Sequence, residues 1–314
     1  MIIHPYTGIA VVPYTRIKEQ AEWFKTFLAK NKITIDKKSI LNEAMEIIKN
    51  LVIWQYDDSK VPANLDTHGA MSKAIGFLYL ISAIRKASSE TSFNKVKKLL
   101  PELAKENPLM TMRDKSTKPR NLSFELETAC LFISTGIEAE SKEPDVVLNY
   151  NGEKWNLPCK MIYSQSAVTL ADRIEEGIEQ MLRYDSSYGM VVLGLSNRID
   201  HSSFIPILDD KKGIYGSFID QKQAERIIRA EIELHFNQIK DQGKTRFDDG
   251  KKTTKFRGIM IVAHTTCVIG KTFSILTGVG LVQRYDLDLP KLVEGPEYRL
   301  SKRFNDIAQK IITE

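Results

Sequence analysis

The sequence has few cysteines and no long apolar run. Its three cysteines, Cys130, Cys159 and Cys267, lie far apart and form no Cys-x-x-Cys pair, so neither a zinc ribbon nor a disulfide framework is expected. No uninterrupted apolar stretch approaches the roughly 20 residues that a membrane helix needs. The first residues also lack the basic start and the small-residue cleavage site of a signal peptide. We therefore expect a cytoplasmic protein with no membrane partner.

Charge of one sign is not in large excess either. The 314 residues carry a formal net charge of +5, and the isoelectric point is about 8.8. This balance permits a polyanionic partner such as DNA without demanding one. The hydrophobic share of 42% is ordinary for a globular protein. The length suits one compact domain with a second, smaller one.

The first hundred residues show helical periodicity. Apolar residues recur there at intervals of three and four in four segments, at 19–31, 39–56, 67–87 and 91–106. The stretch 111–120 is polar, basic and without a period, which is typical of a linker. We therefore predict a mainly helical domain over 1–115 and a second domain over 116–314.

The pattern changes after this linker. One helix, three short strands, a second helix and a fourth strand are predicted at 123–134, 136–140, 145–150, 154–162, 170–182 and 190–195. The pair Asn151-Gly152 is a strong signal for a two-residue hairpin. A hairpin followed by a crossover helix and a further strand builds a mixed sheet with helices packed on it. An α/β fold is predicted, and the later elements are a helix at 221–240, strands at 258–267 and 274–283, and a helix at 301–312.

Charged residues fall at the ends of these predicted elements. Glu125 lies near the start of the first helix, Asp145 begins a strand, and Lys160 lies late in the next strand. Asp145 and Lys160 can therefore sit side by side across the sheet. Hydrolysis of a phosphodiester requires a hard cation, and one or two carboxylates suffice to hold magnesium because it keeps several waters.

These residues also carry a resemblance to a known family. The succession Phe124-Glu125-Leu126, Gly136, Glu143-Pro144-Asp145 and Cys159-Lys160-Met161 resembles the PD-(D/E)xK, or restriction-endonuclease-like, superfamily over roughly a quarter of the chain. The resemblance implies that residues 116–314 form a restriction-endonuclease-like domain. It also implies a metal-dependent nuclease that hydrolyses DNA, with a role in phage defence or restriction.

The resemblance assigns a role to four residues. Asp145 and Glu125 would hold Mg²⁺, or Mn²⁺ in its place. Lys160 would serve the attacking water or the phosphate, and Gln180 on the second helix would support the site.

One position departs from the family. Pro158 stands two residues before Lys160, where the family has Asp or Glu, and proline offers neither a carboxylate nor a backbone N–H. Glu125, Glu127 or Glu153 would have to replace the missing ligand. Alternatively the chain does not cut, and it binds DNA or scaffolds a protein partner in a defence complex. The aromatic residues of the helical half would then dock that partner or a second copy, although ordinary core packing explains them equally well; they are Trp23, Phe24, Phe27, Trp54 and Tyr56.

Two further groups of residues bear on function. The stretch 244–257 is predicted to be a loop beyond a helix, and its basic residues would release counterions from a DNA backbone; a solvated loop is the alternative. The DNA-contacting candidates in it are Lys244, Arg246, Lys251, Lys252 and Lys255. His264 and Cys267 lie on an apolar strand and are predicted to be core residues.

Overall fold

The computed structural model describes most of the chain. The described residues are 2–11, 14–54, 60, 67–105, 118–199, 208–209, 213–214, 220–246, 255–269, 272–283 and 295–311. Their strands are β1 (Ile2–Val11), β2 (Glu138–Lys142), β3 (Asp145–Tyr150), β4 (Glu153–Leu157), β5 (Cys159–Met161), β6 (Tyr188–Gly194), β7 (Leu208–Asp209), β8 (Gly213–Ile214), β9 (Phe256–Ile269) and β10 (Thr272–Gln283). Their longer helices are α1 (Tyr14–Lys30), α2 (Ile40–Trp54), α3 (Thr67–Ala87), α5 (Lys118–Ser134), α6 (Ala167–Arg183), α7 (Gln221–Arg246) and α8 (Pro296–Lys310).

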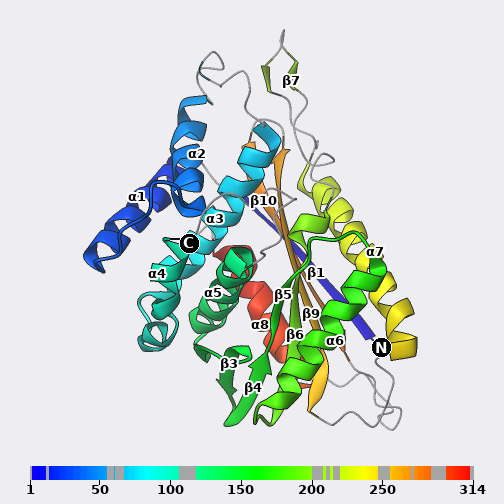
Figure 1. Cartoon of the computed structure of the whole chain (residues 1–314). Coiled ribbons are helices and arrows are strands. Elements are labelled where there is room, and N and C mark those ends of the chain that lie inside the picture. The colour runs from blue at the N-terminus through cyan, green and yellow to red at the C-terminus, as the bar shows by residue number, and fades with distance from the viewer. Residues whose placement is uncertain are drawn as a thin grey trace.

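A mixed sheet forms the centre of the molecule. In the described part of the chain its strands are ordered β1-β10-β9-β6-β4-β3-β2, and β5 pairs with β6 directly after β4. β6 runs parallel to β4, β5 and β9, whereas the β1-β10-β9 and β4-β3-β2 groups are antiparallel. Helices cover both faces of this sheet (Figure 1). The chain is therefore an α/β protein, as its sequence predicts.

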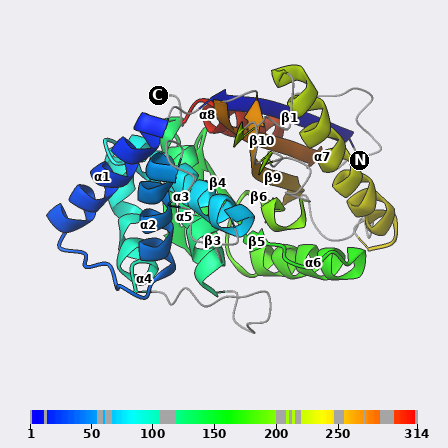
Figure 2. The same cartoon turned by 90° about the horizontal axis from the view of Figure 1, so that it is seen from above.

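The two faces of the sheet are buried under different helices. Along β6, Met190 and Val192 join the buried cluster under α3, α5 and α8, while Val191 and Leu193 join the cluster under α6 and α7. Successive side chains of a strand point to opposite faces, so a strand that is covered on both sides is apolar throughout. This explains the apolar run predicted at 190–195. Figure 2 shows α6 and α7 on one side of the sheet and α3 and α5 on the other.

The first strand departs from the sequence prediction, which placed only helices in this part of the chain. β1 pairs antiparallel with β10 over its whole length, at the edge of the sheet. Pro5 and Gly8 hide this strand in the sequence, because both residue types are depleted in strands. An edge strand tolerates Pro5, which has no backbone N–H to pair. The predicted domain boundary at 115–116 lies outside the described residues.

The helices that precede the linker share their core with the sheet. Buried side chains of α1, α2 and α3 belong to the same cluster as those of α5, α8 and one face of the sheet. Tyr79 of α3 donates a hydrogen bond from its hydroxyl to the backbone carbonyl of Ala308 in α8, at 2.9 Å. The helical segment is therefore fixed against the sheet by both apolar packing and a buried hydrogen bond.

The predicted helix at 91–106 is instead a series of short turns. It consists of two 3₁₀ helices, η2 (Thr91–Lys95) and η3 (Lys97–Leu99), and the four-residue α4 (Leu100–Leu103). From η2 to η3 the buried side chains are spaced by three residues, at Phe93, Val96 and Leu99. That spacing matches the three residues per turn of a 3₁₀ helix, which explains why the prediction of one α-helix was wrong.

The segment from α5 to β6 follows the predicted order of helix, strands, helix and strand. Gly136 has φ 79°, and Asn151 and Gly152 have φ 55° and 80°, as the helix ending and the two-residue hairpin require. The strand predicted at 154–162 is divided into β4 and β5, because Pro158 interrupts it.

The remaining expectations concern the core and the membrane. Cys130 and Cys159 are buried with free thiols. His264 is buried on β9, so its prediction as a core residue is confirmed. The side chain of Cys267 lies outside the described residues. Among the described helices, none combines the length and the hydropathy that a bilayer crossing requires.

Candidate active site at the ends of β3 and β5

Asp145 occupies the point where the ladder between β3 and β4 stops. Val146 pairs with Leu157 of β4. The next backbone N–H after Leu157, that of Cys159, donates to Asp145 Oδ2 at 2.8 Å. The carboxylate thus takes the place of a backbone acceptor. Asp145 also has φ 129°, a conformation that costs a non-glycine residue about 1–3 kcal/mol. The hydrogen bond from Cys159 thus fixes the carboxylate, and the backbone that carries it is strained.

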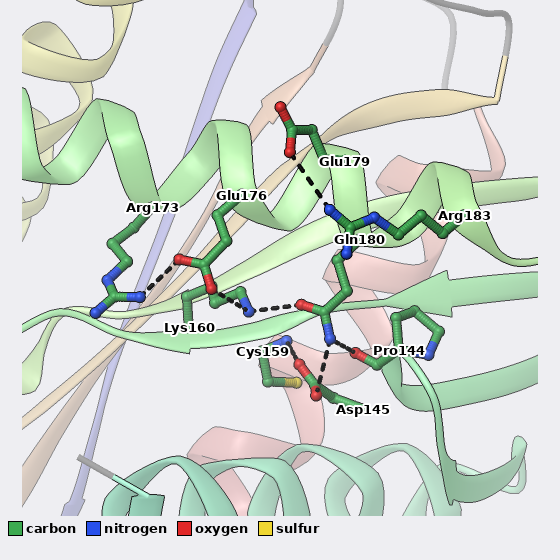
Figure 3. Close-up of polar contacts among 9 residues, drawn as sticks. All are labelled: Pro144, Asp145, Cys159, Lys160, Arg173, Glu176, Glu179, Gln180 and Arg183. Carbon is green, nitrogen blue, oxygen red and sulfur yellow. Dashed lines mark hydrogen bonds and ion pairs between the residues drawn. The ribbon is translucent and has the colours of Figure 1, made fainter. Parts of the chain in front are cut away.

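Gln180 joins Lys160 to Asp145. Lys160 of β5 donates from Nζ to Gln180 Oε1 at 2.6 Å, and the amide nitrogen of Gln180 lies 3.1 Å from the carbonyl oxygen of Pro144 and 3.4 Å from Asp145 Oδ1. Figure 3 shows the Gln180 amide between the ammonium and the carboxylate. The structure therefore brings three of the four predicted site residues into one hydrogen-bonded network.

α6 presents Gln180 because its other side is fixed to the sheet. The helix begins after Ser166, whose hydroxyl accepts the N–H of Thr169 at 3.4 Å as an N-cap. Its apolar side is buried against the sheet, through Leu170, Ile174, Ile178 and Met181.

Glu176 is a further member of the network that the sequence did not suggest. It lies one helical turn before Gln180, and its Oε1 is 3.4 Å from Lys160 Nζ. Its other oxygen accepts from Arg173 at 2.6 Å. The side chain of Lys160 is only 12% exposed, so its ammonium is held between Glu176 and Gln180.

Glu125 reaches the same region from α5. Its Oε1 accepts the hydroxyl hydrogen of Ser141 in β2 at 2.5 Å. An open pocket of about 350 Å³ has both Glu125 and Asp145 in its lining. The other lining residues are Lys98, Leu99, Glu102, Ser141, Lys142 and Glu143. The two predicted metal ligands therefore face one cavity.

Burial and like charges perturb both carboxyl groups. Burial raises the pKa of Glu125 to about 7, and the charge of Asp145 adds to the rise while the Ser141 hydrogen bond opposes it. Burial also raises the pKa of Asp145 to about 6, against the lowering effects of the Cys159 N–H and of Lys160. Both groups are thus costly to ionise without a compensating cation, and a bound cation would favour their charged forms.

These two carboxylates fit a hard divalent cation. Asp145 and Glu125 supply oxygen donors, which Mg²⁺ and Mn²⁺ prefer, and each carboxylate oxygen keeps lone pairs beyond its present hydrogen bond. Within the residues that the structure describes, no group of three or more His, Cys, Asp or Glu side chains is placed to hold a metal ion. Mg²⁺ usually keeps several waters, so two carboxylates suffice to hold it.

The other proposed replacements for the missing acid lie elsewhere. Glu127 is buried in the core, where its Oε1 lies 3.6 Å from His264 Nε2. Glu153 pairs with Tyr150 at the hairpin, five residues along β3 from Asp145, or about 17 Å away. Neither residue is part of the described lining of the pocket, whereas Glu125, the third alternative, is.

Pro158 preserves the path of the strand while removing a carboxylate. The register with β6 is unbroken across it, with Asn156 opposite Gly189 and Cys159 opposite Val192. Its carbonyl still accepts the N–H of Val192 at 2.8 Å. Side chains alternate along a strand, so position 158 shares the face of Lys160. An acid at 158 would lie beside Lys160, and the chain has none there.

The basic stretch after α7 does not join this site in the part that the structure describes. α7 extends through Arg246, so Lys244 and Arg246 belong to a helix and not to the predicted loop, because the helix continues six residues past its predicted end. Lys251 and Lys252 lie outside the described residues. Lys255 is half-buried just before β9, where its carbonyl accepts the N–H of Gly189. Lys160 lies level with Leu193, four residues further along β6 than Gly189.

Comparison with known proteins identifies no relative. No family model matches the sequence, and neither a curated protein nor a solved structure matches it with statistical significance. Function must therefore be argued from the geometry of the site itself.

Proposed function

We propose that this chain is a metal-dependent nuclease that hydrolyses phosphodiester bonds in DNA. One observation carries the proposal: Asp145 and Glu125 face the same pocket, while Gln180 links Asp145 to Lys160. Asp145 of β3 thus belongs both to the pocket that Glu125 of α5 lines and to the network with Lys160 of β5 and Gln180 of α6. Two oxygen ligands beside an ammonium group are the arrangement that phosphodiester hydrolysis requires.

Each residue has a distinct role in this proposal. A divalent cation held by Asp145 and Glu125 would lower the pKa of a bound water and neutralise charge on the phosphate. Lys160 has three N–H donors, of which the described contacts with Gln180 and Glu176 use two, so a third can reach a phosphate oxygen or the attacking water. Gln180 fixes the ammonium and the carboxylate relative to each other, which is a positioning role.

The test is cleavage of supercoiled plasmid and linear duplex DNA with Mg²⁺, with Mn²⁺ and with EDTA. We expect cleavage only with a divalent ion, and a fall of about 10²-fold or more in Asp145→Asn and Lys160→Met. Lys154→Met is the matched control, because Lys154 is an exposed lysine of the same hairpin at the end far from Asp145. Cleavage that survives in Asp145→Asn, or that falls equally in Lys154→Met, would refute the assignment.

A second function, DNA binding without cleavage, is favoured by Pro158. The buried proline supplies no third acid, and Lys160 is held by two side chains of α6. This function predicts a DNA complex whose DNA stays intact under all metal conditions.

Scaffolding of a protein partner has less support. Phe24 is buried in the core, and Trp23 and Phe27 stack against each other at 5.0 Å while packing on that core. The side chains of Trp54 and Tyr56 lie outside the described residues.

A further inference from the structure

The pocket beside the candidate site has walls from two distant parts of the chain. Lys98 and Glu102 come from η3 and α4, whereas Lys142 and Glu143 come from the end of β2 and the turn that follows it. The helical segment therefore helps to build the pocket that Glu125 and Asp145 line.

Lys98 is placed to contact a bound anion. Its side chain is exposed, and its charge lowers the pKa of Glu125, so the ammonium lies close enough to act on that carboxylate. Among the residues that the structure describes, no carboxylate forms an ion pair with Lys98 within 4.0 Å.

Lys142 is the second lysine in the lining of the pocket. It stands opposite Asp145 in the ladder between β2 and β3. Its ion pair with Glu140 is long, at 3.8 Å, and exposed, with 63% of the lysine side chain accessible. An exposed pair of this kind contributes little, so a phosphate can compete for the ammonium.

We propose that Lys98 and Lys142 bind the phosphates of the nucleic-acid backbone next to the candidate active site. This inference rests on the proposed function, because it names the substrate groups that the same site holds. Leu99 is the one apolar residue among the described lining of the pocket, and no aromatic side chain is part of that lining. The pocket thus offers a base nothing to stack on, and it suits the sugar-phosphate backbone.

The charges of the pocket make this binding depend on the divalent ion. Two ammonium groups and four carboxyl groups line it, which leaves two negative charges in excess when all four carboxyl groups are ionised; they belong to Glu102, Glu125, Glu143 and Asp145. A phosphate that enters without a cation meets net repulsion. Cation and nucleic acid therefore bind cooperatively, and each raises the affinity for the other by the same factor.

The experiment measures binding of a fluorescent 20-base-pair duplex by anisotropy, in Ca²⁺ and in EDTA, with a gel to verify that the DNA is intact. The Lys98→Gln/Lys142→Gln double variant is compared with Lys105→Gln/Lys154→Gln. The control removes the same charge from exposed lysines of the same two segments that do not line the pocket. Circular dichroism verifies that both variants are folded.

We expect the pocket variant to bind about 100-fold more weakly, or about tenfold for each charge-assisted contact. The slope of log affinity against log salt should fall by about 2, whereas the control stays within about threefold of the parent. EDTA should weaken binding by the parent at least tenfold, and Glu125→Gln should reduce that dependence. Equal losses in the two double variants, or binding that EDTA leaves unchanged, would overturn the inference.

The two proposals fail separately. Lysine-dependent and ion-dependent binding with no cleavage in Mg²⁺ or Mn²⁺ would remove the nuclease function and leave this inference standing. Ion-dependent cleavage that persists in the pocket variant with unchanged affinity would overturn this inference and leave the nuclease function standing.

Discussion

The candidate site should lower the stability of the protein when no cation is bound. The pKa of Asp145 is about 6 against an ordinary value of 3.8, because its carboxylate is buried. The folded protein therefore holds this proton more tightly than the unfolded chain does. The stability that the bound proton confers is complete below pH 3.8 and is lost as the pH rises through 6. The difference between these values corresponds to about 3 kcal/mol at pH 8.

Asp145→Asn removes this cost, since the amide oxygen can still accept the N–H of Cys159. In EDTA, we expect the variant to exceed the wild type by about 3 kcal/mol in free energy of unfolding at pH 8, and by less than about 1 kcal/mol at pH 4. Urea unfolding followed by circular dichroism at pH 4, 6 and 8 measures the difference. Adding Mg²⁺ at pH 8 should stabilise the wild type alone.

Two results would contradict this reasoning. One is a variant that is less stable than the wild type at pH 8, which would mean that the carboxylate contributes more to the folded state through its hydrogen bonds than its burial costs. The other is a stability difference that does not change between pH 4 and pH 8, which would show that Asp145 titrates at the same pH in both states.

Three substitutions test other parts of the account. Gln180→Leu breaks the link between Lys160 and Asp145 and should slow plasmid cleavage about 10²-fold in a folded protein; an unchanged rate would exclude the positioning role. Pro158→Glu places a carboxylate on the face of Lys160 and should tighten Mn²⁺ binding by at least about tenfold in calorimetry, and the account of the missing acid fails if the affinity does not rise. Glu127→Gln replaces a buried carboxyl group whose pKa burial raises well above its ordinary value, so it should leave cleavage within about twofold; a large loss would place Glu127 in the catalytic machinery.

Local signals in the sequence predicted much of the fold. Gly136 and the pair Asn151-Gly152 adopt the positive φ values that their turns require, and they divide the segment into the observed helix and strands. The strand β1 was missed because its pairing with β10 is a contact between the two ends of the chain, and Pro5 and Gly8 weaken its local signal. Elements bounded by local turn signals were therefore predicted, whereas a strand that depends on pairing with a segment distant in the sequence was not.

The candidate site was predictable only in part, for the same reason. Asp145 and Lys160 fall at corresponding ends of consecutive predicted strands, so their approach could be inferred. The contacts of Glu176 with Lys160 and of Ser141 with Glu125 could not, because they join elements that only tertiary packing brings together. The same holds for Lys98, which lies 27 residues before Glu125 in the sequence and has no motif of its own.

The central claim is that Asp145 and Glu125 together hold a divalent ion beside Lys160. Crystals soaked in Mn²⁺ and measured for anomalous scattering test it most directly. The account predicts an anomalous peak in contact with both carboxylates in the wild type, and loss of that peak in Asp145→Asn. No peak in the pocket, or a peak that persists unchanged in Asp145→Asn, would contradict it.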